Sequence, residues 1–314
     1  MQDSSNFEIY IMSIVAILNP KSANGKAAAK WAKVRAHLPD SVRTIETMGP
    51  GHAIDLTADA IRAGAGTIVA VGGDGTINEV VNGFFDGDRA ITAETKLAIV
   101  PHGTGSDFRR VLNLPWEERK AAEMILREEP RLVDVLRVRY EGHDGRPAMR
   151  YSINVTSFGM GGAVAARVNR SSKPLGGRIA FLAATLRTAI EFAGVSARVT
   201  LDDKKTIEAR ITNVAIGNGQ YHGAGMWVCP GASLDDGLLD VTIIGYLSAF
   251  QMLRSLPSLY NGAIYQHPRV QAFRAKRVKA ESSEPSFIEI DGEPLGRLPI
   301  EIEIVPGAIR ILVL

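Results

Sequence analysis

The chain has 314 residues, of which 46% are hydrophobic and 22% are charged, and its net charge is +2 at pH 7. This length suits two domains of about 130 to 180 residues each, and the composition excludes a disordered or fibrous protein. A net charge so close to zero gives no support to nucleic-acid binding. The single cysteine, Cys229, excludes an intramolecular disulfide and a multi-thiolate metal site, which fits a reducing cytoplasm.

The apolar segments predict a protein that does not cross a membrane. The longest of them, residues 179–195, is interrupted by Arg187 and Glu191 and is shorter than the roughly 18 apolar residues of a spanning helix. The apolar run at residues 9–18 is preceded by acidic residues and by no lysine or arginine, so it predicts a buried strand and not a signal peptide. The sequence leaves open whether the protein starts at Met1 or Met12. We expect a cytoplasmic protein.

The first part of the chain alternates strands with helices. This alternation is typical of a parallel sheet covered by helices, and we predict a Rossmann-like α/β domain over residues 1–133. The predicted strands are 13–19, 41–47, 67–73 and 96–101, and the predicted helices are 25–38, 51–64 and 76–85.

From about Val133 onward, strands follow one another with one long helical stretch near residues 175–194. This pattern predicts a second domain over residues 134–314 that is a mostly antiparallel β-sandwich. The predicted strands are 134–140, 149–159, 196–201, 208–218, 238–246, 287–293, 300–307 and 308–314.

Residues 68–79 read IVAVGGDGTINE, which places a glycine-rich turn directly after a buried strand and before a helix. Glycines let backbone N–H groups approach an anion, and the helix N-terminus favours negative charge, so the turn suits a phosphate. The spacing fits neither the P-loop nor the dinucleotide-binding fingerprint. Asp74 would repel a phosphate unless a cation lay between them, which implies magnesium. The alternative is a tight turn in which Asp74 caps the helix.

Two further turns have the same chemistry. Residues 96–108 read KLAIVPHGTGSDF, in which Ser106 and Asp107 could cap a helix that begins near Phe108. Residues 18–28 read LNPKSANGKAA and place polar residues after the first strand. Since the carboxyl ends of parallel strands meet at one edge of a sheet, the three turns together predict a nucleotide phosphate site.

These motifs, with NGQYHGAGMWVCPGASLDDGLLDV at residues 218–241 and IDGEP at residues 290–294, resemble those of one family. The chain is similar to the diacylglycerol kinase catalytic-domain family, specifically the soluble bacterial lipid kinases, to which sphingosine and ceramide kinases are also similar. The resemblance covers nearly the whole chain. It implies the two-domain fold of the NAD kinase and diacylglycerol kinase type, with the lipid substrate bound in the second domain.

The resemblance also implies which residues contact ATP. They belong to the first loop, the glycine turn and the second glycine motif, and comprise Asn19, Ser22, Thr47, Gly73, Asp74, Gly75, Thr76, Ile77, Asn78, Glu79 and Thr104. The first loop is about two residues longer than the form usual in the family. His102 and Ser106 also stand where the family usually has other residues.

Asp291 and Glu293 lie two residues apart. Along a strand this spacing would put both carboxylates on one face, and Gly292 between them would leave room for a substrate. Phosphoryl transfer needs a carboxylate near the acceptor hydroxyl. The alternative is an ordinary Asp-Gly turn between two strands. The resemblance implies that one of these two acids is the general base, more often Glu293 in this family.

Residues 231–240 read GASLDDGLLD and favour, by themselves, a polar turn. The resemblance implies a structural magnesium here, bound by the Asp236 carboxylate and by the backbone oxygens of Ser233 and Leu238. Such oxygen donors suit this ion. We expect the ion to organise the cleft between the domains and not to take part in the chemistry. His222 lies nearby in a glycine turn and could approach the cleft or form a structural hydrogen bond.

The sequence thus predicts an ATP- and magnesium-dependent kinase that phosphorylates a hydroxyl of a diacylglycerol-like or long-chain lipid. The alternatives are an NAD kinase, which shares the GGDGT turn, and a nucleotide-binding regulator without catalysis. Basic residues after the first domain, among them Arg274, Lys276, Arg277 and Lys279, could hold the protein peripherally on the inner membrane surface. No nucleic-acid partner is expected. The acceptor lipid and the oligomeric state, a homodimer included, are left open.

Overall fold

A four-stranded parallel sheet organises the N-terminal part of the chain. The computed structural model describes residues 13–23, 25–102, 107–127, 129–170, 184–185 and 187–314. The parallel strands lie in the order β2–β1–β3–β6. Their bounds are β1 (Ser13–Leu18), β2 (Arg43–Glu46), β3 (Ala65–Gly72) and β6 (Lys96–Pro101). All eight residues of β3 are buried, as expected of a central strand covered on both faces.

Five helices pack on this sheet through apolar stripes, such as the one that Trp31 and Val34 form on the first helix. A short hairpin, β4 (Phe85–Asp86) and β5 (Arg89–Ala90), follows the third helix. The helices are α1 (Lys26–Arg35), α2 (His52–Arg62), α3 (Asp74–Asn82), α4 (Asp107–Leu112) and α5 (Glu118–Ile125).

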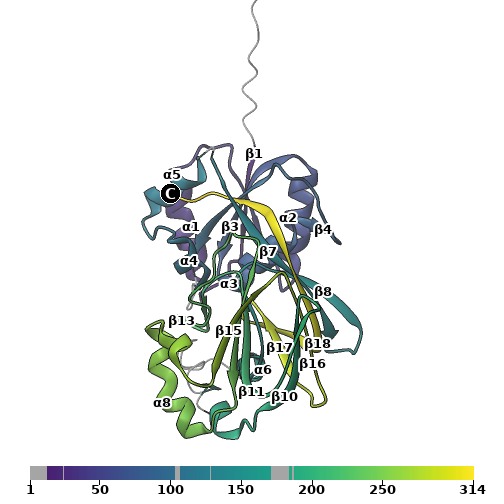
Figure 1. The fold of residues 1–314 in the computed structure, drawn as a ribbon. Helices are drawn as coiled ribbons and strands as arrows, with labels where there is room; N and C mark the ends of the chain where they lie inside the picture. The colour runs from purple at the N-terminus through teal and green to yellow at the C-terminus, as the bar shows by residue number, and fades with distance from the viewer. Residues whose placement is uncertain (1–12, 24, 103–106, 128, 171–183, 186) are drawn as a thin grey trace, which may run out of the picture.

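The C-terminal part is a mostly antiparallel, sandwich-like domain with its own apolar core (Figure 1). The N-terminal α/β fold and this second domain confirm the predicted fold class. Its longer strands are β7 (Arg131–Gly142), β8 (Pro147–Ser152), β9 (Val155–Gly159), β10 (Val195–Leu201), β11 (Lys205–Gly217), β14 (Leu239–Gly245), β15 (Val270–Ala275), β16 (Arg277–Ser282), β17 (Phe287–Ile290) and β18 (Glu293–Ile311). A separate short hairpin consists of β12 (Tyr221–His222) and β13 (Met226–Trp227).

The last strand joins the two domains. β18 pairs antiparallel with β7, β16 and β17, and its end pairs parallel with β6 through Arg310 and Ile311. Ile309, Ile311 and Leu312 are buried in the core of the N-terminal domain. The chain therefore returns to the first domain at its end, and one 14-stranded sheet runs through both domains.

Several elements differ from the sequence prediction. The predicted strand 149–159 is two strands, β8 and β9, and the two predicted strands after residue 300 are one, within β18. Strands β15 and β16 were not predicted, nor was α6 (Met160–Arg170), α8 (Ala249–Tyr260) or η1 (Ala263–Gln266). The predicted helix near 175–194 lies largely outside the described residues, and 187–191 is helical.

The two long helices that were not predicted, α6 and α8, differ in whether their sequences contain a signal for a helix start. Helix α8 begins with a capping box in which Ser248 and Gln251 bond to each other's backbone, a signal present in the sequence. Helix α6 begins with adjacent glycines, which disfavour a helix. A Cβ at Gly162 would lie 2.0 Å from the Phe287 carbonyl oxygen, so close packing on β17 requires glycine there.

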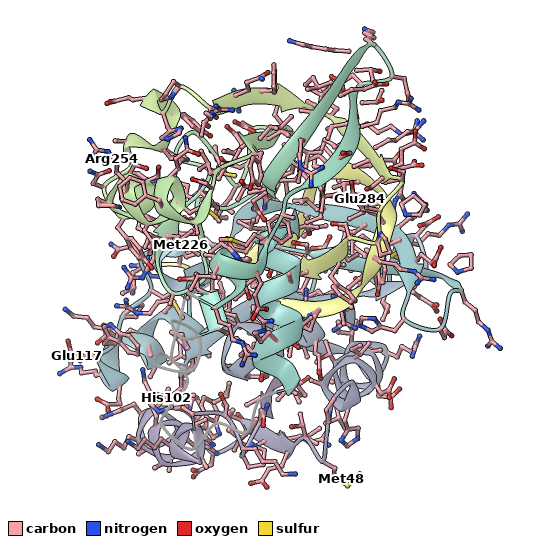
Figure 2. All side chains as sticks on the ribbon, turned by 90° about the horizontal axis from the view of Figure 1, so that it is seen from below. Met48, His102, Glu117, Met226, Arg254 and Glu284 are labelled. Atoms are coloured by element: carbon pink, nitrogen blue, oxygen red, sulfur yellow. The ribbon has the colours of Figure 1, made fainter. Side chains whose placement is uncertain are left out.

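Figure 2 shows Arg254 of α8 at the rim of the molecule. No helix of the described residues is long and apolar enough to cross a membrane.

Asp134 joins the end of β18 to the loop that precedes β14. The residue is 2% exposed, Oδ1 accepts a hydrogen bond from Gly307 N at 2.7 Å, and Oδ2 accepts one from Gly237 N at 2.8 Å. Because an amide cannot accept at both positions, Asp134→Asn should lower the free energy of unfolding by about 1–3 kcal/mol in chemical denaturation. The exposed Asp40→Asn is the control and should change it little. Equal unfolding midpoints for both variants would contradict this role.

Candidate active site

The three polar turns predicted from the sequence meet at the carboxyl edge of the parallel sheet. Asn19 Nδ2 donates to Thr76 Oγ1 at 3.0 Å, which ties the first turn to the glycine turn. Ser22 Oγ donates to the carbonyl of His102 at 2.8 Å, which ties the first turn to the one after β6. His102 N donates to Gly72 O at 2.7 Å. The predicted convergence of the three turns is confirmed.

The glycine turn brings α3 close to both its own strand and the second domain. Gly73 is the N-cap residue of α3, so the alternative in which Asp74 caps this helix is wrong. A Cβ at Gly72 would lie 2.5 Å from Thr76 Oγ1, and one at Gly75 would lie 2.7 Å from Glu293 Oε1. Glycine is therefore required at position 72, because Thr76 occupies the adjacent space, whereas at position 75 the neighbouring atom is the end of the flexible Glu293 side chain.

Asp74 and Asp107 form an acidic pair at this edge. Asp107 N donates to Asp74 Oδ2 at 3.4 Å, and the Oδ1 atoms of both residues are buried without a hydrogen-bond partner among the described residues. Burial, followed by the charge of Asp107, raises the pKa of Asp74 to about 6. Two unpartnered carboxylate oxygens of this kind fit a hard cation. Magnesium is commonly held by one or two carboxylates, with phosphates and water completing its shell.

This raised pKa predicts a pH-dependent contribution to stability in metal-free protein. Unfolded aspartate titrates near pH 4, so between about pH 4 and 6 the folded protein keeps a proton that the unfolded chain has lost. The contribution is complete below pH 4 and is lost as the pH rises through 6. The free energy of unfolding of the wild type, minus that of Asp74→Asn, should fall over this range in denaturant titrations. A difference independent of pH would contradict the raised pKa.

The predicted acid pair lies in a tight turn and not along a strand. Ile290 pairs with Glu293 across a two-residue loop in which Asp291 has φ 49° and Gly292 has φ 89°. Positive φ at both positions is typical of the type I′ hairpin with an Asp-Gly loop. The prediction that both carboxylates share one strand face is therefore wrong, because the strand ends at Ile290. The local conformation is the Asp-Gly turn considered as the alternative.

Asp291 is buried and extensively hydrogen-bonded. Oδ1 accepts from Ser152 Oγ at 2.7 Å and from two backbone amides, those of Asn154 and Val155. Oδ2 accepts from Asn78 Nδ2 at 2.7 Å and from the amide of residue 153 at 3.0 Å. With five donors around it, this carboxylate holds α3, β8 and β9 together.

Glu293 is in a different environment, since it is exposed and lies against Gly75 at the start of α3. Burial lowers the pKa of Arg150. The charges of the nearby Glu79, Asp291 and Glu293 oppose this shift but are smaller in effect. The Nε of Arg150 donates to Asn78 Oδ1 at 2.8 Å. Arg150 was not predicted from the sequence, because it occurs in no recognisable motif and reaches the site through the pairing of β8 with β7.

Most of the predicted nucleotide and acidic residues line one cavity: Asn19, Ser22, Thr47, Gly73, Asp74, Gly75, Thr76, Glu79, Asp291 and Glu293. Ile77 and Asn78 are not among its lining residues. Ile77 is 1% exposed in the core, and Asn78 bonds to Asp291 and to the Tyr151 carbonyl. Glu79 accepts hydrogen bonds from the amides of Gly51 and Ala53 at the start of α2. Thr104 lies outside the described residues.

The predicted magnesium loop near residue 236 is separate from this cavity. The Asp236 carboxylate is paired with Arg274 and accepts a hydrogen bond from the amide of Leu238. Ser233 Oγ donates to Asp235, which is paired with Arg131. No group of three or more acidic, histidine or cysteine side chains suited to a metal occurs among the described residues. Because arginines already balance these charges, the loop presents no open cation site, and magnesium at Ser233, Asp236 and Leu238 stays a prediction.

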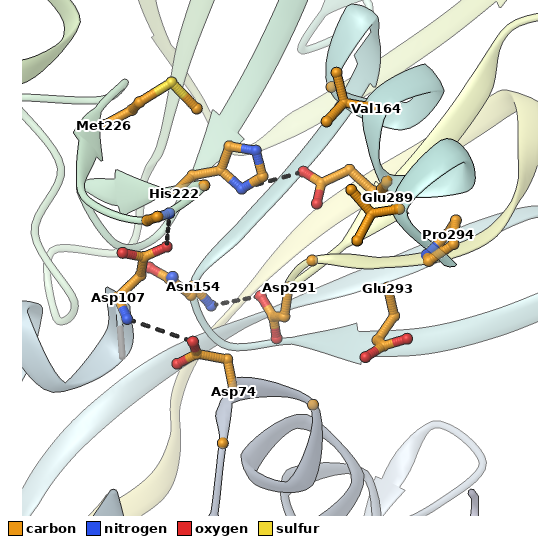
Figure 3. A pocket seen from close by; sticks show the side chains of 18 of the residues that line it. Asp74, Asp107, Asn154, Val164, His222, Met226, Glu289, Asp291, Glu293 and Pro294 are labelled. Carbon is orange, nitrogen blue, oxygen red and sulfur yellow. Dashed lines mark hydrogen bonds and ion pairs between the residues drawn. The ribbon is translucent and has the colours of Figure 1, made fainter. Parts of the chain in front are cut away.

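The cavity has a volume of about 860 Å³ and two chemically different ends. One end is the polar edge just described, where Asp74 and Asp107 face Asp291 (Figure 3). The other end extends between α6, α8 and β14, and Thr212, Asn213, Ser255 and His267 also line it. Most of the side chains that line it are apolar, among them Val164, Ile244, Met252, Leu256, Leu259 and Ile264. Such a shape can place a polar group beside the glycine turn while burying a hydrocarbon chain.

A glycine turn at the carboxyl edge of a parallel sheet, faced by acids from an antiparallel domain, defines a two-domain nucleotide-binding kinase. The diacylglycerol kinase catalytic domain matches residues 13–138, and the YegS C-terminal NAD kinase beta sandwich-like domain matches residues 154–313. The chain therefore belongs to this family of lipid kinases, and the family predicted from the motifs is confirmed.

Individual relatives agree with this assignment. A protein of Stenotrophomonas maltophilia named "Probable lipid kinase YegS-like" is 30% identical over 300 residues, which are 94% of each chain. A diacylglycerol kinase of Mycobacterium tuberculosis is 30% identical over 307 residues, which are 96% of this chain and 95% of that one. A Bacillus anthracis structure described as a candidate diacylglycerol kinase has a TM-score of 0.74 at 25% identity and covers 96% of this chain and 98% of that one. Yeast NADH kinase, 13% identical with a TM-score of 0.50, shares the fold alone.

Proposed function

We propose that this protein transfers the γ-phosphoryl group of ATP to a hydroxyl of a diacylglycerol-like or long-chain lipid, with magnesium as the cofactor. The observation that carries the proposal is the single cavity that joins the glycine turn and Glu293 to an apolar end. The triphosphate would lie on the amides of the turn and on the N-terminus of α3, which favour anions. The hydrocarbon part of the lipid would occupy the apolar end.

The reaction assigns a role to each acid. The acceptor oxygen forms a bond to the γ-phosphorus, the bond from that phosphorus to the β–γ bridging oxygen breaks, and ADP leaves with the electron pair. The proton of the acceptor hydroxyl goes to Glu293, the exposed acid beside Gly75. Asp291 instead fixes the hairpin, since five donors already surround it. Asp74 and Asp107 would hold the magnesium ion, which neutralises phosphate charge when bound.

The NAD kinase alternative is weaker for this chain. Its support is the shared GGDGT turn and the fold-level likeness to yeast NADH kinase. A dinucleotide acceptor would need polar partners throughout its length, whereas at the acceptor end of this cavity aliphatic side chains and methionines outnumber polar ones such as Ser255 and His267. A regulator without catalysis would bind ATP and phosphorylate nothing.

A substrate screen tests the proposal. Radiolabelled ATP and magnesium should be incubated with the protein and mixed micelles of diacylglycerol, monoacylglycerol, sphingosine, ceramide or phosphatidylglycerol, and the lipid extract analysed for label. We expect a labelled lipid that disappears when magnesium is chelated. Label in NAD and in no lipid would establish the NAD kinase alternative, and tight ATP binding without turnover would establish the regulator.

Helix α8 supports a peripheral membrane contact as part of this proposal. Met252, Leu256 and Leu259 line the cavity, whereas Phe250 and Leu253 of the same helix are 74% and 46% exposed. A bilayer in contact with the exposed face would lie beside the apolar end of the cavity. Of the basic residues predicted to contact headgroups, Arg274, Arg277 and Lys279 are already paired with acids. We therefore assign the contact to apolar side chains of α8.

Removing the exposed apolar side chains should weaken this contact. We expect the double variant Phe250→Ser and Leu253→Ser to bind phosphatidylglycerol vesicles at least about tenfold less tightly in sedimentation assays, because each buried side chain contributes about 1.5–3 kcal/mol. Leu132→Ser is the matched control. Leu132 is also an exposed apolar residue, at 50%, but it lies at the start of β7 and not on α8. Equal vesicle binding by the wild type and the double variant would remove α8 from the contact.

A further inference from the structure

A buried carboxylate–imidazole pair lies between the two ends of the cavity. Glu289 is 0% exposed, and its Oε1 accepts a hydrogen bond from Ser157 Oγ at 2.8 Å. The same oxygen is 3.4 Å from Nδ1 of His222, whose side chain is 12% exposed. Figure 3 shows His222 and Glu289 between Asp291 on one side and Val164 and Met226 on the other. The reaction described above uses neither residue.

The surrounding elements fix the position of the imidazole. His222 pairs with Met226 in the β12–β13 hairpin, and the amide of Ala224 in its loop donates to Asp107 Oδ2 at 3.0 Å. Glu289 lies on β17, which pairs with β9 through Ser157. The ring is thus held from one side by the hairpin and from the other by a carboxylate.

The carboxylate also determines which ring nitrogen of His222 is available to the cavity. An ionised Glu289 close to Nδ1 favours the neutral imidazole that carries its proton on Nδ1, and this tautomer leaves the Nε2 lone pair free. No hydrogen bond involving Nε2 of His222 occurs among the described residues, and His222 lines the cavity. Glu289 Oε2 is also buried without a partner among the described residues. Burial raises the pKa of Glu289, whereas the charge of His222 and the hydrogen bond from Ser157 oppose this rise and favour the carboxylate. The pair therefore offers the cavity a hydrogen-bond acceptor at its midpoint.

We propose that His222, oriented by Glu289, binds a second hydrogen-bond donor of the lipid headgroup, a hydroxyl or an amine next to the hydroxyl that is phosphorylated. This inference rests on the proposed function. It adds a preference for acceptor lipids that carry a hydroxyl or an amine beside the phosphorylated hydroxyl, which the fold alone does not require. His222 contacts the substrate in this scheme, and Glu289 is a positioning residue. An anionic group is disfavoured here, because the nearby Asp107, Glu289 and Asp291 carboxyls would repel it.

Three synthetic acceptors with the same alkyl chain test the selectivity. They are a 3-alkoxypropane-1,2-diol, a 2-amino-3-alkoxypropan-1-ol and a 3-alkoxypropan-1-ol, which differ only in the group beside the primary hydroxyl. The measured quantity is the ratio of kcat/KM for the diol or the amine to that for the plain alcohol. This ratio is independent of the fraction of folded protein, because both rates come from one preparation.

The wild type should prefer the diol, the amine or both over the plain alcohol by about 10-fold to 100-fold, since a site that binds a polar group discriminates against the analogue without it. His222→Phe keeps the ring and removes both nitrogens, so the ratio should fall to near 1. His222→Gln, whose Oε1 can take the place of Nε2, should restore part of the preference. The larger of the two ratios identifies whether the donor is a hydroxyl or an amine.

Variants of Glu289 test its positioning role through the same ratio of kcat/KM values. Glu289→Leu should abolish the preference as His222→Phe does, and the two changes together should have no additional effect on the ratio, because Glu289 acts through His222. Glu289→Gln keeps an acceptor for the Nδ1 proton and should keep most of the preference. Asp134→Asn, which alters a buried carboxyl away from the cavity, is the control and should leave the ratio unchanged.

The outcomes separate this inference from the proposed function. Phosphorylation of all three lipids at equal kcat/KM by the wild type, or an unchanged preference in His222→Phe, would overturn the inference and leave the lipid kinase assignment intact. Failure of the wild type to phosphorylate any lipid, in this series or in the earlier screen, would overturn both.

Discussion

Asp74→Asn is expected to lower kcat by about 10²- to 10³-fold and at the same time to raise the stability of the metal-free protein at neutral pH. Under the proposed function, activity is lost because a neutral amide would be a poor ligand for the cation that would balance the transferring phosphate, and single electrostatic contacts to a transition state are worth factors of this size. The gain in stability follows because the pKa of Asp74 is raised to about 6, so above that pH the folded protein contains a charge that its surroundings disfavour.

Steady-state kinetics at saturating ATP and lipid, with thermal unfolding in the presence of a chelator, measure the two effects. Asp55→Asn is the matched control, since Asp55 is also an acid in the first turn of a helix, α2, but is exposed. The interaction with the helix dipole is thus removed in both variants. A loss of both activity and stability in Asp74→Asn would show that the carboxylate is structural.

The N-terminal half of the site could be predicted from sequence because its determinants are local. Each of its turns follows a short apolar strand and precedes a helix, and parallel topology then brings the turns to one edge without further information. The hydrogen bonds from Asn19 to Thr76 and from Ser22 to His102 are consequences of that topology. Most of the nucleotide-binding residues that the family resemblance implies line the polar end of the cavity.

The second domain was predicted less accurately because its contacts are distant in sequence. Asp291 binds the backbone of residues about 140 positions earlier, a contact that requires β17 to pair with β9. Arg150 and Glu289 belong to no motif and reach the cavity through the same pairings. The glycine-rich start of α6 contradicts local propensity and is explained only by its close packing on β17. Periodicity cannot reveal such long-range requirements.

The two acids of the hairpin illustrate the limit of a motif. In the sequence, Asp291 and Glu293 are two carboxylic acids separated by one residue, and nothing there distinguishes them. In the structure, Asp291 is buried among five hydrogen-bond donors, whereas Glu293 is exposed beside Gly75. A base must accept a proton during the reaction, and an oxygen already saturated by hydrogen bonds does so poorly. Environment, and not residue type, therefore favours Glu293 over Asp291 as the base of the proposed reaction.

Glu293→Gln is accordingly expected to lower kcat by about 10²- to 10⁴-fold, the usual contribution of a general base, while the unfolding midpoint stays close to that of the wild type. KM for ATP should change little, because in the proposed function the triphosphate would lie on the turn and not on this side chain. Initial rates with radiolabelled ATP, together with urea unfolding, check both expectations.

Asp291→Asn provides the comparison that decides between the two acids. Because the amide would place N–H groups against backbone donors, this variant should lose about 3 kcal/mol of stability, and part of its activity loss should be recovered at lower temperature, where more of the protein is folded. If Glu293→Gln retained wild-type kcat while folded Asp291→Asn did not turn over, the proton would go to Asp291. The hydrogen bonds around that residue would then have to rearrange when the nucleotide binds.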